Sequence, residues 1–463
     1  MSRAAAISRA EAYFDSGAFK SDLARRVAIP TESQNPERGP ELGRYLSSEI
    51  APALEKLGFA CRALTQQKAK GPFLYAERIE DPALPTVLGY GHGDVIRGLD
   101  AGWQPGLSPW ELTEKDGRYY GRGVVDNKGQ HTINIAAQAA VLAERGKLGF
   151  NAKWLIEMGE ETGSPGLREV CAENRELLKA DVLVGSDGPR LTADRPTISL
   201  GTRGAYPIDI WIDAREGGHH SGNWGGLLSS PAIQLVHALS TITGPTGQIR
   251  IPEWVPAAGI PDSVRGALAD CEIASAPGDP EIDPNWAEPG LTLAEKVFAW
   301  CTFDILAMTA GNPESPVNAV PPRAWARGQI RFVVGTDPDE FLPALRRHLD
   351  RHGFPMVQIA KGRDDIMNAT RLDPEHPWAR WAATSVAKTT NKKPAVLPNV
   401  GGSLPNDIFS EGLGLPTIWL PHSYPGCSQH APNEHFPTAL AREALGIMAG
   451  LYWDLGEPGT PRA

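Results

Sequence analysis

The first 200 residues of the chain alternate between two hydrophobic periods. Two stretches, 7–27 and 41–57, repeat their apolar positions as amphipathic helices do. Apolar runs that predict strands follow at 73–77, 86–90, 152–157 and 181–188. Helical patterns that separate these strands lie at 130–145 and 165–178. Alternating strands and helices predict an α/β domain with a mixed, mostly parallel sheet flanked by helices.

The pattern changes at Arg203. Residues 205–213 alternate as a half-exposed strand and 227–242 are helical. Two further strands, at 323–334 and 355–360, flank a helix at 338–351. The stretch 243–290 is rich in proline and glycine and predicts a long surface loop. From about residue 376 the α/β pattern returns, with a strand at 415–420 and a helix at 438–453. We therefore predict a catalytic domain made of 1–202 and 371–463, interrupted by a smaller α+β domain over 203–370.

Histidine and carboxylate side chains follow the ends of the predicted strands or begin the next helix. They are His92, Asp94, Asp126, Glu160, Glu161 and Asp187. Open α/β sheets gather their ligands at this edge. An adjacent glutamate pair alone is most often two solvated charges. Six such residues at one edge instead indicate a metal-assisted hydrolase, in which one carboxylate binds a cation and another carries a proton.

Composition narrows the chemistry. The 463 residues suffice for two or three domains. A net charge of −10 argues against nucleic acid or an anionic membrane as the main partner. The chain shows no apolar run of roughly 18 residues, so we expect a cytoplasmic protein. Five scattered cysteines without a Cys-x-x-Cys pair do not support a disulfide framework or a thiolate site. Histidines and carboxylates must then hold any metal, which suits zinc, manganese or cobalt.

Another dense polar stretch covers residues 421–436, between a predicted strand and a predicted helix. It contains His422, His430 and His435. Each of these could equally be a hydrogen-bonded core or surface histidine. Spacing alone leaves their roles open, as it does for His219 and Cys427.

Five motifs occur in order along the chain: Gly91-His92-Gly-Asp94, Gly121-Arg-Gly-Val-Val-Asp126-Asn-Lys-Gly129, Glu160-Glu161-Thr-Gly-Ser, Ser186-Asp187-Gly and Asn433-Glu-His435. Together they closely resemble the dinuclear zinc metallopeptidase family of aminoacylase, succinyl-diaminopimelate desuccinylase, carboxypeptidase G and carnosinase. The resemblance implies two divalent ions per chain, Zn²⁺ first and Mn²⁺ or Co²⁺ as alternatives, bridged by Asp126. It assigns His92 and Asp187 to one ion, and Glu161 and His435 to the other. Glu160 would be the general base, and Asp94 would hold the second ring nitrogen of His92.

The inserted domain resembles the lid of the carnosinase-like branch through Thr202-Arg-Gly204 and His219-His220-Ser-Gly-Asn-Trp-Gly-Gly226. The resemblance implies that His220 reaches across a homodimer, formed through the lid, to polarise the scissile carbonyl. Asn318 and Arg331, thirteen positions apart (331 − 318), match a polar side chain and the arginine that binds the substrate carboxylate. Gly401, Gly402 and Ser403 resemble a glycine loop with backbone donors free for substrate.

The expected function is hydrolysis of a dipeptide or a similar small substrate with a free carboxylate. Hydrolysis of an N-acyl amino acid or a ureido compound is the main alternative, because the same metals and base act on any amide carbonyl. A binding protein that has lost catalysis would show a broken ligand set, whereas every expected ligand is present. A phosphoesterase suits a bare two-metal site but gives Arg331 no role. The sequence does not identify the amide.

Overall fold

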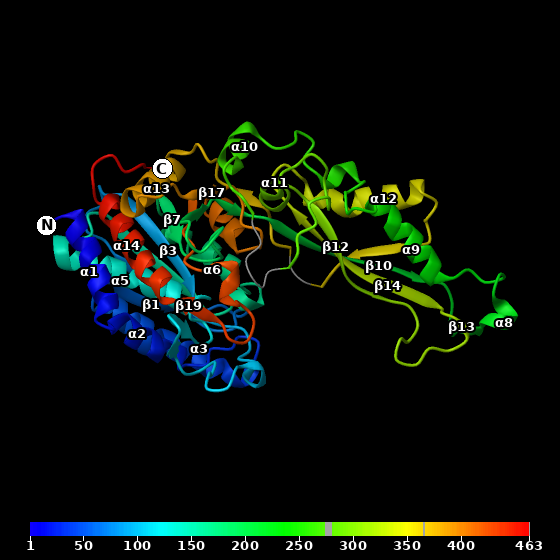
Figure 1. The fold of residues 1–463 in the computed structure, drawn as a ribbon, viewed down its shortest axis with the longest axis horizontal. Helices are drawn as coiled ribbons and strands as arrows, with labels where there is room; N and C mark the ends of the chain where they lie inside the picture. The colour runs from blue at the N-terminus through cyan, green and yellow to red at the C-terminus, as the bar shows by residue number, and fades with distance from the viewer. Residues whose placement is uncertain (274–279, 364–365, 463) are drawn as a thin grey trace.

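The computed structural model describes residues 1–273, 280–363 and 366–462. Figure 1 shows a larger domain built on one sheet and, beside it along the longest axis, a smaller domain built on another. Both chain termini lie in the larger domain, far from the smaller one. Within the described residues, no helix is both long and apolar enough to cross a membrane.

The larger domain contains an eight-stranded sheet. Its strands, in spatial order, are β1 (Ala60–Leu64), β2 (Phe73–Arg78), β6 (Asn151–Glu157), β3 (Thr86–His92), β7 (Val182–Gly185), β18 (Thr417–Trp419), β8 (Thr197–Ser199) and β17 (Ala395–Leu397). The central strands β6, β3, β7 and β18 run parallel. The pairs β1–β2, β2–β6 and β18–β8 are antiparallel. The predicted mixed sheet flanked by helices is confirmed.

Helices bury both faces of this sheet. Successive residues of β6 point to opposite sides, so Trp154 and Ile156 join one core cluster and Leu155 joins another. The first cluster lies under α1 (Arg3–Asp15), α5 (Lys128–Arg145) and α14 (Thr438–Leu455). The second lies under α6 (Leu167–Glu173) and the π-helical turn η7 (Ile408–Gly412). The remaining helices of the domain are α2 (Ala18–Val27), α3 (Gly39–Tyr45), α4 (Ala51–Glu55), α7 (Arg175–Leu178) and α13 (Pro377–Thr390).

The smaller domain is an antiparallel sheet with two helices on one face. Its strand order is β12 (Thr302–Thr309), β14 (Arg323–Phe332), β10 (Gly204–Asp213) and β15 (Gln358–Lys361). Alternate residues of β14, among them Ala326 and Ile330, are buried with α9 (Pro231–Ile242) and α12 (Phe341–Arg351). The intervening residues of β14 lie on the opposite, helix-free face. The edge strand β12 was not predicted from the sequence.

The end of the smaller domain that lies farthest from the large sheet contains a pair of very short strands and a short helix (Figure 1). Strand β11 (His219–His220) pairs there with β13 (Ala319–Val320), and the short helix α8 (Ser221–Trp224) follows β11. We call this unit the tip.

The chain passes between the domains through two adjacent strands, β9 (Gly201–Thr202) and β16 (Thr370–Arg371), which pair antiparallel. The Asn399 side-chain amide donates to the carbonyls of Thr202 and Thr370, at 3.1 and 2.7 Å. Both crossing strands are thereby tied to the larger domain.

The stretch predicted as a surface loop, 243–290, is partly ordered structure, although its residues 274–279 lie outside the described part. It contains α10 (Asp262–Leu268), and α11 (Leu293–Phe298) follows it. Both helices pack with Ala395 and Leu397 of β17 in a separate apolar cluster. Short helices of seven and six residues escape detection by periodicity. This inserted segment therefore covers the edge of the large sheet.

Candidate active site

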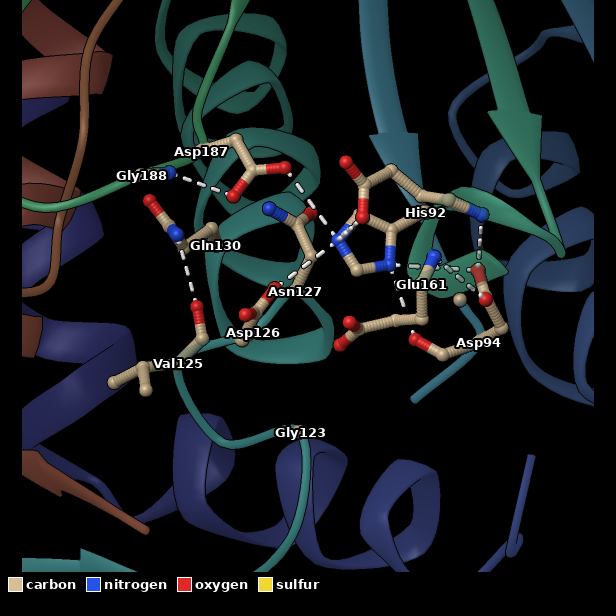
Figure 2. A network of polar contacts seen from close by, with 12 residues as sticks. His92, Asp94, Gly123, Val125, Asp126, Asn127, Gln130, Glu161, Asp187 and Gly188 are labelled. Atoms are coloured by element: carbon tan, nitrogen blue, oxygen red, sulfur yellow. Dashed lines mark hydrogen bonds and ion pairs between the residues drawn. The ribbon is translucent and has the colours of Figure 1, made fainter. Parts of the chain in front are cut away.

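The predicted histidine and carboxylates converge at the carboxyl ends of the central strands (Figure 2). His92 ends β3, Asp126 lies two residues before α5, and Asp187 follows β7. The His92 Nε2 atom lies 3.1 Å from Asp126 Oδ1 and 3.4 Å from Asp187 Oδ2. All three side chains are buried. The structure thus brings these three predicted side chains together at one edge of the sheet.

Asp94 makes hydrogen bonds that hold His92 and the two glutamates in position. With its Nδ1 protonated, His92 donates to the Asp94 carbonyl oxygen at 3.0 Å, which leaves Nε2 facing the carboxylates. The Asp94 carboxylate accepts the backbone N–H groups of Glu160 and Glu161 at 3.1 and 3.2 Å. One buried aspartate therefore orients the histidine and the turn that carries both glutamates.

A second trio shares Asp126 with the first. His430 Nε2 lies 3.0 Å from Asp126 Oδ2 and 3.0 Å from Glu161 Oε2. The two oxygens of Asp126 thus face two different histidines, His92 and His430. In each trio the potential ligand atoms lie within 4.8 Å of one another. This is the arrangement that a carboxylate bridging two metal ions requires.

The structure places His430, and not His435, in the second trio. Ser428, His430 and Asn433 have positive φ angles of 57°, 58° and 65°, so the backbone turns sharply before β19 (His435–Pro437). The His435 ring lies against Tyr120 and, through Nδ1, donates to the Asn433 carbonyl at 3.0 Å. The sequence motif offered several histidines, and the choice depended on loop geometry that periodicity does not reveal.

Glu160 lies beside the first trio. Its Oε2 atom is 3.9 Å from His92 Nε2. Burial, together with Asp187 and Glu161, raises the pKa of Glu160 well above its usual range, against the opposing effect of His92. Burial, followed by the charge of Asp126, raises the pKa of Glu161 to about 7. Such carboxyl groups can hold a proton near neutral pH.

The neighbouring carboxylates also shift the pKa values of the two histidines. Burial alone would lower the pKa of His92, but its hydrogen bond to Asp126 and the nearby carboxylate of Asp187 raise it well above the usual range. Hydrogen bonds to Asp126 and Glu161 raise the pKa of His430 to about 11. A cation bound beside these rings would neutralise the same carboxylates.

The residues present fit two divalent ions. The donor set consists of imidazole nitrogens and carboxylate oxygens, which suits zinc and its neighbours. Asp187 Oδ2 is buried and has no hydrogen-bond partner among the described residues. A buried carboxylate oxygen without a hydrogen bond is costly unless a cation binds it. Two ion positions can therefore be assigned, one to each trio.

Glu434 supports the shared ligand and was not recognised as a site residue from the sequence. Its buried carboxylate pairs with Arg122 at 2.8 Å. It also accepts the backbone N–H groups of Gly123, Val125 and Asp126, at 3.1, 3.1 and 3.3 Å. Because Glu434 follows the His430 turn, it joins the loop that carries His430 to the loop that carries Asp126. Only its place within the Asn433-Glu-His435 motif hinted at this role.

Among the predicted substrate-binding residues, Arg331 and the glycine loop contact each other. Arg331 donates from Nη1 to Ser403 Oγ at 2.8 Å. A Cβ atom built on Gly188, next to Asp187, would lie 3.6 Å from the side chain of Val400, which immediately precedes Gly401. The chain that leads into the glycine loop therefore lies next to the loop that carries Asp187.

The structure does not bring His220 and Asn318 to this group. Both are exposed in the tip, where the Ser221 N–H donates to the Asn318 carbonyl at 2.9 Å. Strand β14 begins near the tip and ends beside Arg331, and its ten residues span about 30 Å. Within one chain, His220 and Asn318 lie at the opposite end of this strand from Arg331.

The chain resembles known proteins over nearly its whole length. It is 30% identical over 449 residues to the Cys-Gly metallodipeptidase dug1 of Schizosaccharomyces pombe, covering 90% of this chain and 91% of that protein. It is 35% identical over 249 residues to the mouse Beta-Ala-His dipeptidase, an alignment that spans only half of each chain. The crystal structure of human carnosine dipeptidase 1 has the same fold, with a TM-score of 0.76, 22% identity and coverage of 97% of this chain and 98% of that one. Residues 88–454 match peptidase family M20/M25/M40, and the chain therefore belongs to this family.

Proposed function

We propose that the protein is a metal-dependent dipeptidase that cleaves a small substrate with a free carboxylate. The observation that carries this proposal is the Asp126 carboxylate, whose two oxygens face His92 and His430 while Glu160 lies alongside. The dipeptidase names of the aligned relatives favour the same reaction.

His92 and Asp187 would hold one ion, Glu161 and His430 the other, and Asp126 would bridge them. We expect Zn²⁺, with Mn²⁺ or Co²⁺ as alternatives. Such ions, when bound, polarise an amide carbonyl and make a water molecule more acidic. Glu160 then accepts the water proton and delivers it to the leaving amine, a role that its raised pKa suits. Asp94 keeps His92 and the Glu160 turn in place for this transfer.

Arg331 is the proposed anchor for the substrate carboxylate. Three arginines follow one another at every fourth position on the helix-free face of β14. Arg323 pairs with Asp213 at 2.9 Å, and Arg327 forms two bonds of 2.8 Å with Asp209. The residue opposite Arg331 is Ala205, which offers no carboxylate. A substrate carboxylate can supply the missing partner, with the backbone of Gly401 and Gly402 and the Ser403 hydroxyl beside it.

We further propose that residues 203–370 form a lid through which the protein dimerises. The edge strand β12 exposes Ile305 and Leu306, and α9 exposes Ile233 and Val236. An apolar group of this kind beside an unpaired sheet edge favours association with another chain. A symmetric partner could bring its own tip to the first chain's metal site, and so deliver His220 and Asn318. In that complex His220 would polarise the scissile carbonyl.

Hydrolysis assays on the metal-depleted protein, with Zn²⁺, Mn²⁺ or Co²⁺ added back, test the activity. The substrate panel should contain α-dipeptides, β-alanyl dipeptides and N-acyl amino acids. We expect metal-dependent cleavage of at least one dipeptide and little cleavage of N-acyl amino acids. Cleavage of only the N-acyl amino acids would replace the dipeptidase with an amidohydrolase, and cleavage of none would refute both.

A further inference from the structure

A second arginine contacts the loop that Arg331 contacts. Arg203 donates from Nε to the Gly401 carbonyl at 3.0 Å, and its own carbonyl accepts the Ser403 hydroxyl at 2.8 Å. Ser403 in turn accepts from Arg331. The two arginines therefore hold the two ends of the glycine loop.

The strand register also places Arg203 close to Arg331. Ala205 lies directly opposite Arg331 in the β10–β14 ladder. Side chains two positions apart on an extended strand share a face, and diagonal neighbours across a ladder are about 7–8 Å apart or less. Burial, followed by the charge of Arg331, lowers the pKa of Arg203 to about 10, which agrees with two adjacent cations.

No carboxylate of the described residues forms an ion pair with either arginine. The acid whose charge acts on both is Asp304 of β12, which lies opposite Gln329 and makes no ion pair with them. This differs from Arg323 and Arg327, whose acids lie opposite them on β10. The Arg203–Arg331 pair thus carries two positive charges beside the glycine loop.

One carboxylate can accept two parallel hydrogen bonds from the guanidinium group of one arginine. The terminal nitrogens of Arg203 make no hydrogen bond within the described part of the chain, so a second guanidinium group remains once Arg331 has bound the substrate's terminal carboxylate. We propose that Arg203 is a specificity-determining residue that selects dipeptides with aspartate or glutamate at the C-terminal position. Arg331 binds the α-carboxylate, and Arg203 binds the side-chain carboxylate of the same residue. This inference rests on the proposed dipeptidase function.

The test compares kcat/KM for matched pairs of substrates, Ala-Glu with Ala-Gln and Ala-Asp with Ala-Asn, in the metal-loaded enzyme. The wild type should favour the acidic member of each pair by about tenfold or more, because the amide substrates cannot form the charged pair with Arg203. Arg203→Gln should bring this ratio close to one, and Arg203→Lys should retain part of it. Arg327→Gln, on the same sheet face but already paired with Asp209, is the matched control and should keep the wild-type ratio.

The ratio separates specificity from loop structure. If Arg203 only shaped the glycine loop, Arg203→Gln would lower kcat/KM for both members equally and leave the ratio unchanged, which would overturn the proposal. Equal rates for Ala-Glu and Ala-Gln in the wild type would overturn it as well. Absence of hydrolysis of all four peptides would also overturn the proposal, whereas the dipeptidase function itself is tested by the wider substrate panel.

Discussion

The metal site and the tip of the smaller domain differ in one respect. A single chain brings together the residues of the metal site, whereas the tip residues lie far from it in the same chain. At the metal site, both trios are assembled from loops of a single larger domain and are held by Asp94 and Glu434. At the tip, His220 and Asn318 are exposed and lie at the end of the smaller domain that is farthest from the large sheet. In our proposal, one chain suffices to bind metal, whereas catalysis requires a tip supplied by a second chain.

Replacing Glu160 should give the largest effect on catalysis without disturbing the metal site. Glu160→Gln removes the proton carrier but no assigned ligand, so kcat should fall by about 10²–10⁴ while the metal content stays at the wild-type value. Steady-state kinetics and elemental analysis check the two parts. Wild-type turnover in this variant would remove Glu160 from the mechanism.

Replacing His430 and His435 separately tests which of the two histidines binds metal. His430→Ala should reduce the metal content from about two ions per chain to about one, since the second trio loses its nitrogen ligand. His435→Ala is the matched control and should keep both ions, because His435 faces Tyr120. The reverse result would restore the ligand assignment made from the sequence.

Replacing Arg331 tests whether this arginine binds the substrate carboxylate. Arg331→Ala should raise KM by about 10–100-fold, since a charge-assisted pair contributes roughly 1.5–3 kcal/mol. Arg323→Ala, on the same strand but paired with Asp213, should change KM little. Equal effects of the two substitutions would indicate that both disturb the smaller domain and that Arg331 does not bind the substrate carboxylate.

Glu434 tests how the metal site is held together, with a smaller effect expected on catalysis than from Glu160. Glu434→Gln leaves Arg122 buried without its counter-charge, so the metal-free protein should lose about 3–5 kcal/mol of stability. Metal affinity should fall by about 10–100-fold as the Asp126 loop loosens. Chemical denaturation and competition with a chelator measure these quantities. An unchanged metal affinity would show that the loop needs no such support.

The sequence predicted most of the features that depend on the local pattern of hydrophobic and polar residues, namely the positions of strands and helices. Strand ends located His92 and Asp187 because parallel strands present their carboxyl ends at one edge, and the start of a helix located Asp126. Helix α5, predicted at 130–145, begins only two residues earlier, at Lys128. The predicted helix 7–27 is divided at Gly17, whose φ of 80° ends the first segment.

Features that depend on long-range packing were not predictable. The choice between His430 and His435 depends on three left-handed residues in one loop. The role of Glu434 requires its contact with the backbone of Val125, more than 300 positions away. Six consecutive residues of strand β12 are exposed at a sheet edge, so its pattern does not alternate as a half-buried strand does.

The most direct test of a site shared between two chains is to mix two inactive variants, His220→Ala and Glu160→Gln. In a mixed symmetric dimer, one of the two sites would combine an intact Glu160 with the partner's intact His220. At equal amounts and full subunit exchange, about a quarter of the wild-type activity should return. No recovered activity, with exchange confirmed by differently tagged subunits, would contradict the assignment of the tip to the neighbouring chain.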